Sequence, residues 1–513
     1  MAAPINEPCL SPTESLPSED DEEQQLLFEL DELHSLKPPE QLSTPGLLLL
    51  TCPSLGLQVC WFLLQSSGTV RPPSIHLTHP SPSSQSLKAK MNQPYLSSLG
   101  MSPSSISLTW ALGPIFGAFA QPIIGQLSDE LHHPLGRRKP VMIAGALTTV
   151  ISTLLMACAP ELTAPFTGHP PAADPPWQPR ALAVACLVVV LLALTAYSVG
   201  VRAIVVDACP PSQQSAAAAF SMRWNVLGSA VLSTAGFVST TITTTKQSSE
   251  TDPIVAFRTL ACVAAICSAA TVGLVCWFVP RDATPPLRQS GSGSGIGRVC
   301  AMCLPGELAR RWRRLPPLTG RVCGVQLVAW FGWFPVLYYM STYAHETESK
   351  AKPYALYASL SFSLGTLLST LLLTLLSHIS NVLHPRSLSR LWLLSQVLAT
   401  ASLLLTIPFQ TSTASLVLLS LIGATQAVTM WVPFALINTE LAEVRTGVAG
   451  VQGLHNMAIS LPQVASALVC AAVLAGLDLL GVGRDAVWLL RLAAVPVAWS
   501  AWLIWRLDGA VVT

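Results

Sequence analysis

Twelve long apolar runs alternate with shorter polar segments along the chain. Each run is about 20 residues long, and a helix of that length crosses the ~30 Å hydrocarbon layer of a bilayer. Gly and Pro recur inside the runs, as in "LGPIFGAFAQPIIG", and membrane helices tolerate both residues. The pattern predicts an all-α membrane protein with spans at Pro45–Leu64, Ser104–Leu127, Pro140–Ala159, Arg180–Ala203, Ser215–Val238, Ile254–Phe278, Gly320–Tyr343, Ala355–Ser377, Ser389–Ile407, Thr413–Asn438, His455–Leu477 and Val487–Trp505.

The composition agrees with a chain surrounded by lipid. Of the 513 residues, 51% are hydrophobic and only 11% are charged, whereas about a quarter of a soluble domain is charged. No Walker-type glycine loop, HExxH or GxSxG motif indicates an ATPase or an enzyme. The thirteen cysteines lie mostly in apolar runs, and the one CxxC, at Cys300–Cys303, has no second pair that would complete a metal site. We therefore expect no enzyme, no metal, no cofactor and no nucleic-acid partner.

Lysine and arginine positions predict the orientation of the chain. "GRRKP" (Gly136–Pro140) joins the second and third spans, and seven arginines lie between the sixth and seventh. The positive-inside rule places these segments, and with them both termini, in the cytosol. No basic segment followed by an apolar run opens the chain, so we expect no cleaved signal peptide.

The spans divide into six and six around an arginine-rich segment with "RQSGSGSGIG". We expect an acidic disordered tail at 1–44, six-helix bundles at 45–280 and 320–507, a flexible cytosolic linker at 281–319 and a cytosolic tail at 508–513. An extracellular loop at 66–100 contains a Pro/Ser-rich insert at 70–93, which is either a real loop or a gene-model artefact. This layout resembles the major facilitator superfamily, in which two bundles rock around a central site.

Three charged residues in or beside apolar spans are candidate functional groups, because a charge in hydrocarbon costs at least ~2.5 kcal/mol. Arg202 and Asp207 are five residues apart in "VRAIVVDACPP". At about 100° per residue their side chains point ~140° apart, so they cannot pair along one helix face. Arg202 either snorkels or lines a cavity, and Asp207 either occupies an interfacial turn or has a function. Arg223 lies about 12 Å into the fifth run, which favours a cavity-facing position.

Four stretches resemble the glycoside–cation symporter branch of that superfamily, which includes sucrose and α-glucoside proton symporters, in its fungal and animal form. They are "PIIGQLSDELHHPLGRRKPVMIAG" (Pro122–Gly145), "VRAIVVDACPPSQQSAAAAFSMRWNVLG" (Val201–Gly228), "QLVAWFGWFPVLYYMSTYAHE" (Gln326–Glu346) and "WVPFALINTE…GLHNMAISLPQV" (Trp431–Val464). The chain departs from the family pattern at Ala218, Asn225 and Ser229.

The resemblance implies that Asp207 is the proton-binding carboxylate. A carboxylate at a helix C-terminus and partly removed from water is destabilised in its charged form. Arg223 is its predicted partner in the unprotonated carrier, or a donor to sugar hydroxyls. The turn between the second and third spans is predicted to be a cytosolic gate, with topology alone as the alternative, and its residues are Gly125, Ser128, Asp129, Gly136, Arg137 and Arg138.

Other polar and aromatic residues are candidates for a sugar cavity. Trp330 and Trp333 either stack on a pyranose ring or pack in the protein, and Gln326 could reach hydroxyls. His455, Asn456 and Gln463 either line the cavity or hydrogen-bond between helices. Together with Arg202, these residues form the predicted substrate cavity.

The sequence therefore predicts a monomeric carrier in the lipid bilayer that transports sucrose or a related α-glucoside such as maltose together with protons. The plasma membrane is the expected location, with a vacuolar or other organellar membrane as an alternative. Two other functions stay open on the same scaffold. One is a non-transporting sugar sensor, and the other is an organellar sugar exporter.

Overall fold

The computed structural model describes residues 39–68, 95–167, 176–245, 253–279, 305–346, 364–372, 384–445, 447–481 and 486–510. The predicted 1–44 tail and 70–93 insert lie largely outside these residues, as does the first part of the predicted linker. Of the predicted 508–513 tail, residues 508–510 are helical. Residues 364–372 form one helical stretch. The other helices are α2 (Thr44–Thr51), α3 (Pro53–Gly68), α5 (Tyr95–Ser98), α6 (Pro103–Ile115), η1 (Phe116–Ala120), α7 (Gln121–Asp129), α8 (Lys139–Ala157), α9 (Ala159–Thr167), α10 (Trp177–Ala208), α11 (Pro211–Thr245), α12 (Pro253–Phe278), α14 (Pro305–Arg313), α15 (Pro317–Glu346), α17 (Pro385–Leu405), α18 (Ser412–Val444), α19 (Val448–Leu479) and α20 (Ala486–Ala510).

Proline begins many of the helices, because its fixed backbone angle and missing N–H fit the first turn. Pro53 opens α3 after a break at Cys52, and Pro211 opens α11. α10 ends at Ala208, shortly before Pro210–Pro211 and beyond the predicted limit at Ala203. Several helices continue beyond the predicted spans; α19, for example, begins at Val448 rather than His455. Hydropathy detects only the apolar part of such a helix.

The all-α membrane fold is confirmed. Within the described ranges, nine helices are long and apolar enough to cross a bilayer, and this does not settle the predicted number of twelve. Large apolar side chains are exposed on several of them, including Ile266 at 69% and Leu468 at 70%. Lipid, unlike water, accepts such surfaces without penalty.

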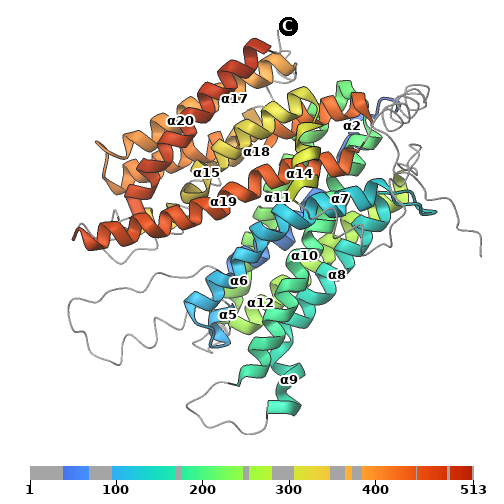
Figure 1. The fold of residues 1–513 in the computed structure, drawn as a ribbon. Coiled ribbons are helices and arrows are strands. Elements are labelled where there is room, and N and C mark those ends of the chain that lie inside the picture. Colours follow the sequence, from blue (N-terminus) through green and yellow to red (C-terminus); the bar gives the residue numbers. More distant parts are fainter. Residues whose placement is uncertain are drawn as a thin grey trace, which may run out of the picture. The chain divides into compact units, whose positions relative to one another are not determined.

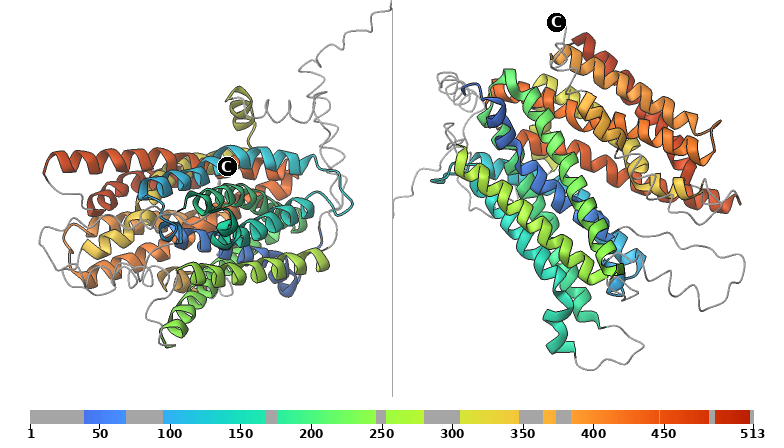
Figure 2. Two further views of the ribbon diagram at one scale, coloured as in Figure 1. Left: turned by 90° about the horizontal axis from the view of Figure 1, so that it is seen from below. Right: turned by 180° about the vertical axis from the view of Figure 1, so that it is seen from behind.

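The helices of each half pack mainly on one another (Figures 1 and 2). In the first half, α10 packs on α8, and α3 packs on α11 and α12; in the second, α20 packs on α15 and α17. The halves meet most extensively where α7 packs on α19 and α11 packs on α18, and α6, η1 and α10 also contact α19. One buried apolar cluster likewise draws on both halves, with Ala203 and Met222 from the first and Trp392 and Trp431 from the second.

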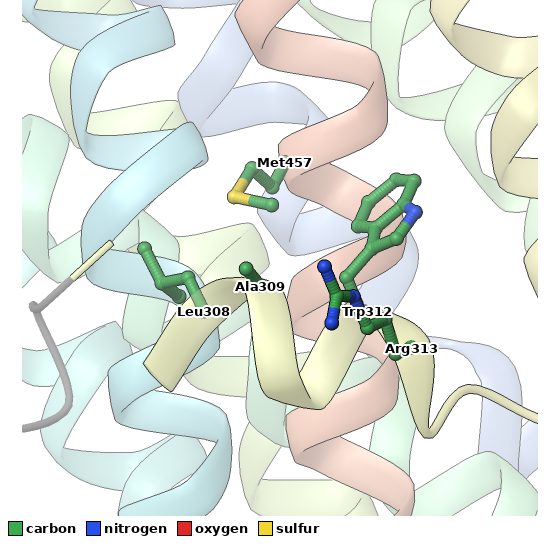
Figure 3. Close-up of a pocket in the computed structure, with 5 residues that line it drawn as sticks. All are labelled: Leu308, Ala309, Trp312, Arg313 and Met457. Atoms are coloured by element: carbon green, nitrogen blue, oxygen red, sulfur yellow. The ribbon is translucent and has the colours of Figure 1, made fainter. Parts of the chain in front are cut away.

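The predicted 281–319 linker is helical in part. Residues Pro305–Arg313 form α14, whose Glu307 pairs with Arg310 and Arg311. A pocket of about 360 Å³ lies between α14 and Met457 of α19, with the lining residues drawn in Figure 3. Leu308, Ala309 and Trp312 make its lining largely apolar, with Arg313 as the charged group. A sugar needs several convergent hydrogen-bonding groups, so this pocket does not suit one.

Lys139 joins α8 to the end of α12. Its ammonium group is buried and donates to the carbonyls of Val279 at 2.6 Å and Cys276 at 3.3 Å. A cation at a helix C-terminus stabilises carbonyls that have no intrahelical donor. We expect Lys139→Met to destabilise the protein by about 1–3 kcal/mol and Lys139→Arg to retain much of the contact. Thermal unfolding of the purified protein measures both; equal midpoints for Lys139→Met and the unmodified protein would contradict this role.

Candidate functional site: a charged closure and a polar layer between the halves

A buried charge network lies where α7 and α10 end and α8 begins. We call this region, defined by Asp129, Arg137, Arg138 and Asp207, the arginine end. The Asp207 carboxylate contacts Arg138 Nε at 2.6 Å and Arg137 Nη2 at 3.0 Å. Arg138 also contacts Asp129 Oδ1 at 2.6 Å and donates to Ser128 Oγ at 3.0 Å. These side chains are at most 5% exposed, so water screens the contacts little.

Local backbone chemistry brings this network together. Gly136 has φ +87° in the turn before α8, a left-handed conformation that glycine adopts without steric cost. Its amide donates to the carbonyl of His133 at 2.9 Å, which closes the turn and leads into Arg137 and Arg138. Burial acts to lower the pKa of Arg138, but the carboxylates of Asp207 and Asp129 outweigh it and hold that pKa above its ordinary value. Arg138 therefore keeps its charge at any physiological pH.

Asp129 extends the network from the first half to the second. Its carboxylate accepts from the backbone amides of Ala449 at 3.2 Å and Gly450 at 2.8 Å. Both amides lie in the first turn of α19, where no intrahelical acceptor is available and the helix dipole attracts an anion. The network thus joins the arginine end, in the first half, to the start of α19 in the second half.

Small residues allow α7 and α19 to cross closely beside these bonds. A Cβ added to Gly125 would lie 2.2 Å from the carbonyl oxygen of Ala449, and one added to Gly453 would lie 2.5 Å from Cα of Pro122. Any larger residue would push the backbones apart. The six residues predicted as a gate therefore form one contiguous region, and Ala449, Gly450 and Gly453 complete it from the other half. Gating itself stays a prediction.

The structure separates Asp207 from its predicted partner, Arg223. Asp207 is held by Arg137 and Arg138, while the Arg223 guanidinium lies 4.5 Å from the ring centroid of Phe220, one turn earlier on α11. These described residues form no ion pair with each other in this state. The charge of Asp207, which the sequence analysis expected to be destabilised by burial and by the helix end, is compensated by Arg137 and Arg138. The sequence analysis could not include these arginines, because they lie in a distant turn.

Deeper between the halves lies a polar layer centred on Arg202. The residue is half-buried about 9 Å before the end of α10. Its Nη1 donates to Asn456 Oδ1 at 3.2 Å, and its guanidinium lies 4.6 Å from the ring centroid of Phe434. The Phe434 ring also meets His455 edge-on at 4.7 Å. Arg202 and Asp207 thus have separate partners, as their helical spacing predicted.

Two further predicted cavity residues are buried with unused hydrogen-bonding capacity. Within the described part of the chain, neither ring nitrogen of His455 and neither amide atom of Gln326 has a hydrogen-bond partner. Buried polar groups are usually paired, so such exceptions call for an explanation. Gln463 is half-buried further along α19.

Trp330 and Trp333, the two tryptophans predicted either to stack on a sugar or to pack in the protein, pack in the protein in this state. Trp333 is 1% exposed, and its Nε1 donates to Gln396, which in turn bonds Thr429 at 2.6 Å. Trp330 belongs to the same buried cluster of the second half. A hydrogen bond of 3.1 Å between Gln58 and Ser229 joins α3 to α11. Sequence reasoning recorded Ser229 only as a departure from the family pattern and missed this pair, since it requires two distant helices.

Comparison with known proteins identifies relatives over most of the chain. The sequence model of the Major Facilitator Superfamily matches residues 89–467. The chain is 24% identical to the General alpha-glucoside permease of Schizosaccharomyces pombe, over 89% of this chain and 92% of that protein. It is 26% identical to the Sucrose transport protein SUT5 of Oryza sativa subsp. indica, over 75% of this chain and 78% of that protein.

Solved structures agree with this fold. The proton:xylose symporter XylE superposes with a TM-score of 0.59 at 13% identity, covering 90% of this chain and 95% of its own. The human organic anion transporter MFSD10 superposes with a TM-score of 0.56 at 17% identity, covering 89% and 97%. Such low identities bear on the fold and not on the substrate.

Proposed function

Because this chain belongs to the Major Facilitator Superfamily, and is thus a multi-pass membrane transporter rather than an enzyme, we propose that it transports sucrose or a related α-glucoside together with protons. The two long sequence matches described above support the sugar class. Alternating access is supported by the two hydrogen bonds that Asp129 accepts from the first amides of α19. They hold one end of the interface closed, and they can break without unfolding either half. The arginine end is then the cytosolic gate, closed in this state.

The polar layer supplies suitable groups for a sugar. Arg202, Asn456 and His455 combine donors and acceptors between the halves, Gln326 adds a buried amide in α15, and sugar hydroxyls need both kinds of group. His455 and Gln326 have hydrogen-bonding capacity to spare in this state. A sugar that occupied the layer would supply partners that these side chains lack.

Proton coupling is assigned to Asp207 with a revised partner set. In this state Arg137 and Arg138 compensate its charge, and a proton there would leave both arginines without that carboxylate. We therefore propose that a proton arriving from the outside releases both arginines and lets the arginine end open, and that Asp207 gives up this proton to the cytosol in the open state. Arg223 remains available for the substrate rather than for Asp207.

Uptake of labelled sucrose and maltose into host cells that lack their own carriers tests this function. We expect uptake above the empty-vector level for at least one of the two sugars, and its collapse when an uncoupler removes the proton gradient. Uptake that persists with the uncoupler would exclude proton coupling but would leave the proposed sugar class intact. Absence of uptake of either sugar, by protein shown to be at the cell surface, would reject the substrate class.

A further inference from the structure

One hydrogen-bonded chain crosses the two halves within the polar layer. Arg202 of α10 donates to Asn456 Oδ1 of α19 at 3.2 Å, and Asn456 Nδ2 donates to the carbonyl oxygen of Gly117 in η1 at 3.1 Å. Both ends of one carboxamide are therefore used, one as acceptor and one as donor. Asn456 Nδ2 also lies 3.1 Å from Ser460 Oγ, one turn along its own helix.

The sequence leaves the Gly117 carbonyl without a hydrogen-bond donor in its own helix. Residues Phe116–Ala120 form a π-helical turn, and the amide of Gln121 donates to the carbonyl of Phe116, five residues earlier. In that register the carbonyl of Gly117 would receive the amide of residue 122, which is a proline and has no N–H. A buried carbonyl without a donor costs free energy, so it needs a partner from elsewhere.

Asn456 can reach this carbonyl because residue 117 is glycine. A Cβ at that position would lie 2.5 Å from Ser460 Oγ and 3.0 Å from Asn456 Nδ2. The partner also lies in the opposite half, so the bond exists only while η1 and α19 stay together. Separation of the halves would release Arg202 and leave the Gly117 carbonyl to another donor.

We propose that Asn456 is a positioning residue that couples closure of the arginine end to the orientation of Arg202. It does so through the Gly117 carbonyl, which Pro122 leaves without a donor in its own helix. While the halves are closed, Asn456 holds the guanidinium over Phe434. When they part, the same step breaks both bonds and frees Arg202 to turn. This inference goes beyond the proposed sugar, since it holds for any ligand of the polar layer.

Hydrogen–deuterium exchange of the native α19 terminus measures closure directly. The amides of Ala449 and Gly450 have no intrahelical acceptor, and Asp129 of the other half binds both. Their exchange therefore reports separation of the halves. We expect Asn456→Ala to accelerate exchange in peptides containing these two residues by about tenfold, because the closed state loses two hydrogen bonds and buries an unpaired carbonyl.

Pro122→Ala distinguishes this coupling from general loosening. The alanine amide can satisfy the Gly117 carbonyl within its own helix, so in the Asn456→Ala background it should reverse part of the acceleration. In the otherwise unmodified protein it should change exchange by less than about twofold, because a carbonyl oxygen has two lone pairs and can still accept from Asn456. The same effect of Pro122→Ala in both backgrounds would overturn the proposal.

Asn438→Ala is the matched control. It removes another buried asparagine amide, one that accepts from Gln452 at 3.1 Å within the second half. Exchange should remain near the unmodified rate, and acceleration equal to that of Asn456→Ala would attribute the effect to loosening of α19. Exchange in α12 peptides checks that each variant is folded. No sugar is needed, so failure here leaves the transport assay unaffected, and failed transport leaves this test valid.

Discussion

Asp207→Ala is expected to destabilise the protein by about 3–5 kcal/mol, because removal of one partner from a buried ion pair leaves the other charge uncompensated. Arg137 and Arg138 both contact this carboxylate, at side-chain exposures of 3% and 0%. Arg137 and Arg138 would both lose the Asp207 carboxylate, while the Asp129–Arg138 contact would persist. Unfolding of purified protein in detergent should shift to a clearly lower midpoint, and transport should fall with it.

An exposed ion pair provides the control for this effect. Glu161 pairs with Arg258 at side-chain exposures of 56% and 36%. Water screens such pairs, and most contribute little to stability. Glu161→Ala should leave the unfolding midpoint nearly unchanged. If Asp207→Ala shifts the midpoint no further than Glu161→Ala, the network at the arginine end does not stabilise the closed state.

Gly125→Ala is expected to reduce transport at least tenfold while the protein stays folded. Its new Cβ would lie 2.2 Å from the carbonyl oxygen of Ala449, and backbone atoms cannot yield as a flexible side chain can. The closed arrangement of α7 and α19 would be lost, together with the bonds from Asp129 to Ala449 and Gly450. A tenfold effect on rate requires a change of only about 1.4 kcal/mol in activation free energy. The free-energy cost of so close a contact is larger than this.

Gly273→Ala is the corresponding control, because a Cβ there would meet nothing within 4 Å. Initial rates of sugar uptake, normalised to the amount of protein at the membrane, compare the two variants. Gly273→Ala should transport at the unmodified rate. Unmodified transport by Gly125→Ala would mean that this helix crossing never closes during the cycle.

The sequence determined the elements of this protein and the candidates for its site. Apolar runs and prolines fixed the helices, because helix length and the missing proline N–H are local properties. The rarity of charges in lipid singled out Arg202, Asp207 and Arg223, and the spacing of Arg202 and Asp207 excluded a pair between them. The glycines and charges of the turn at Asp129–Arg138 marked the candidate gate through the family resemblance, since such motifs are contiguous in the chain.

Only the tertiary structure decided the partners. Asp207 binds the arginines of a turn about 70 residues away rather than Arg223, and Asp129 binds amides 320 residues away. A buried charge takes the nearest compensating group in space, which helix packing selects and linear spacing does not encode. The Gly117 carbonyl shows both contributions. Pro122 removes its local donor through the sequence, whereas the approach of α19 supplies Asn456 in its place.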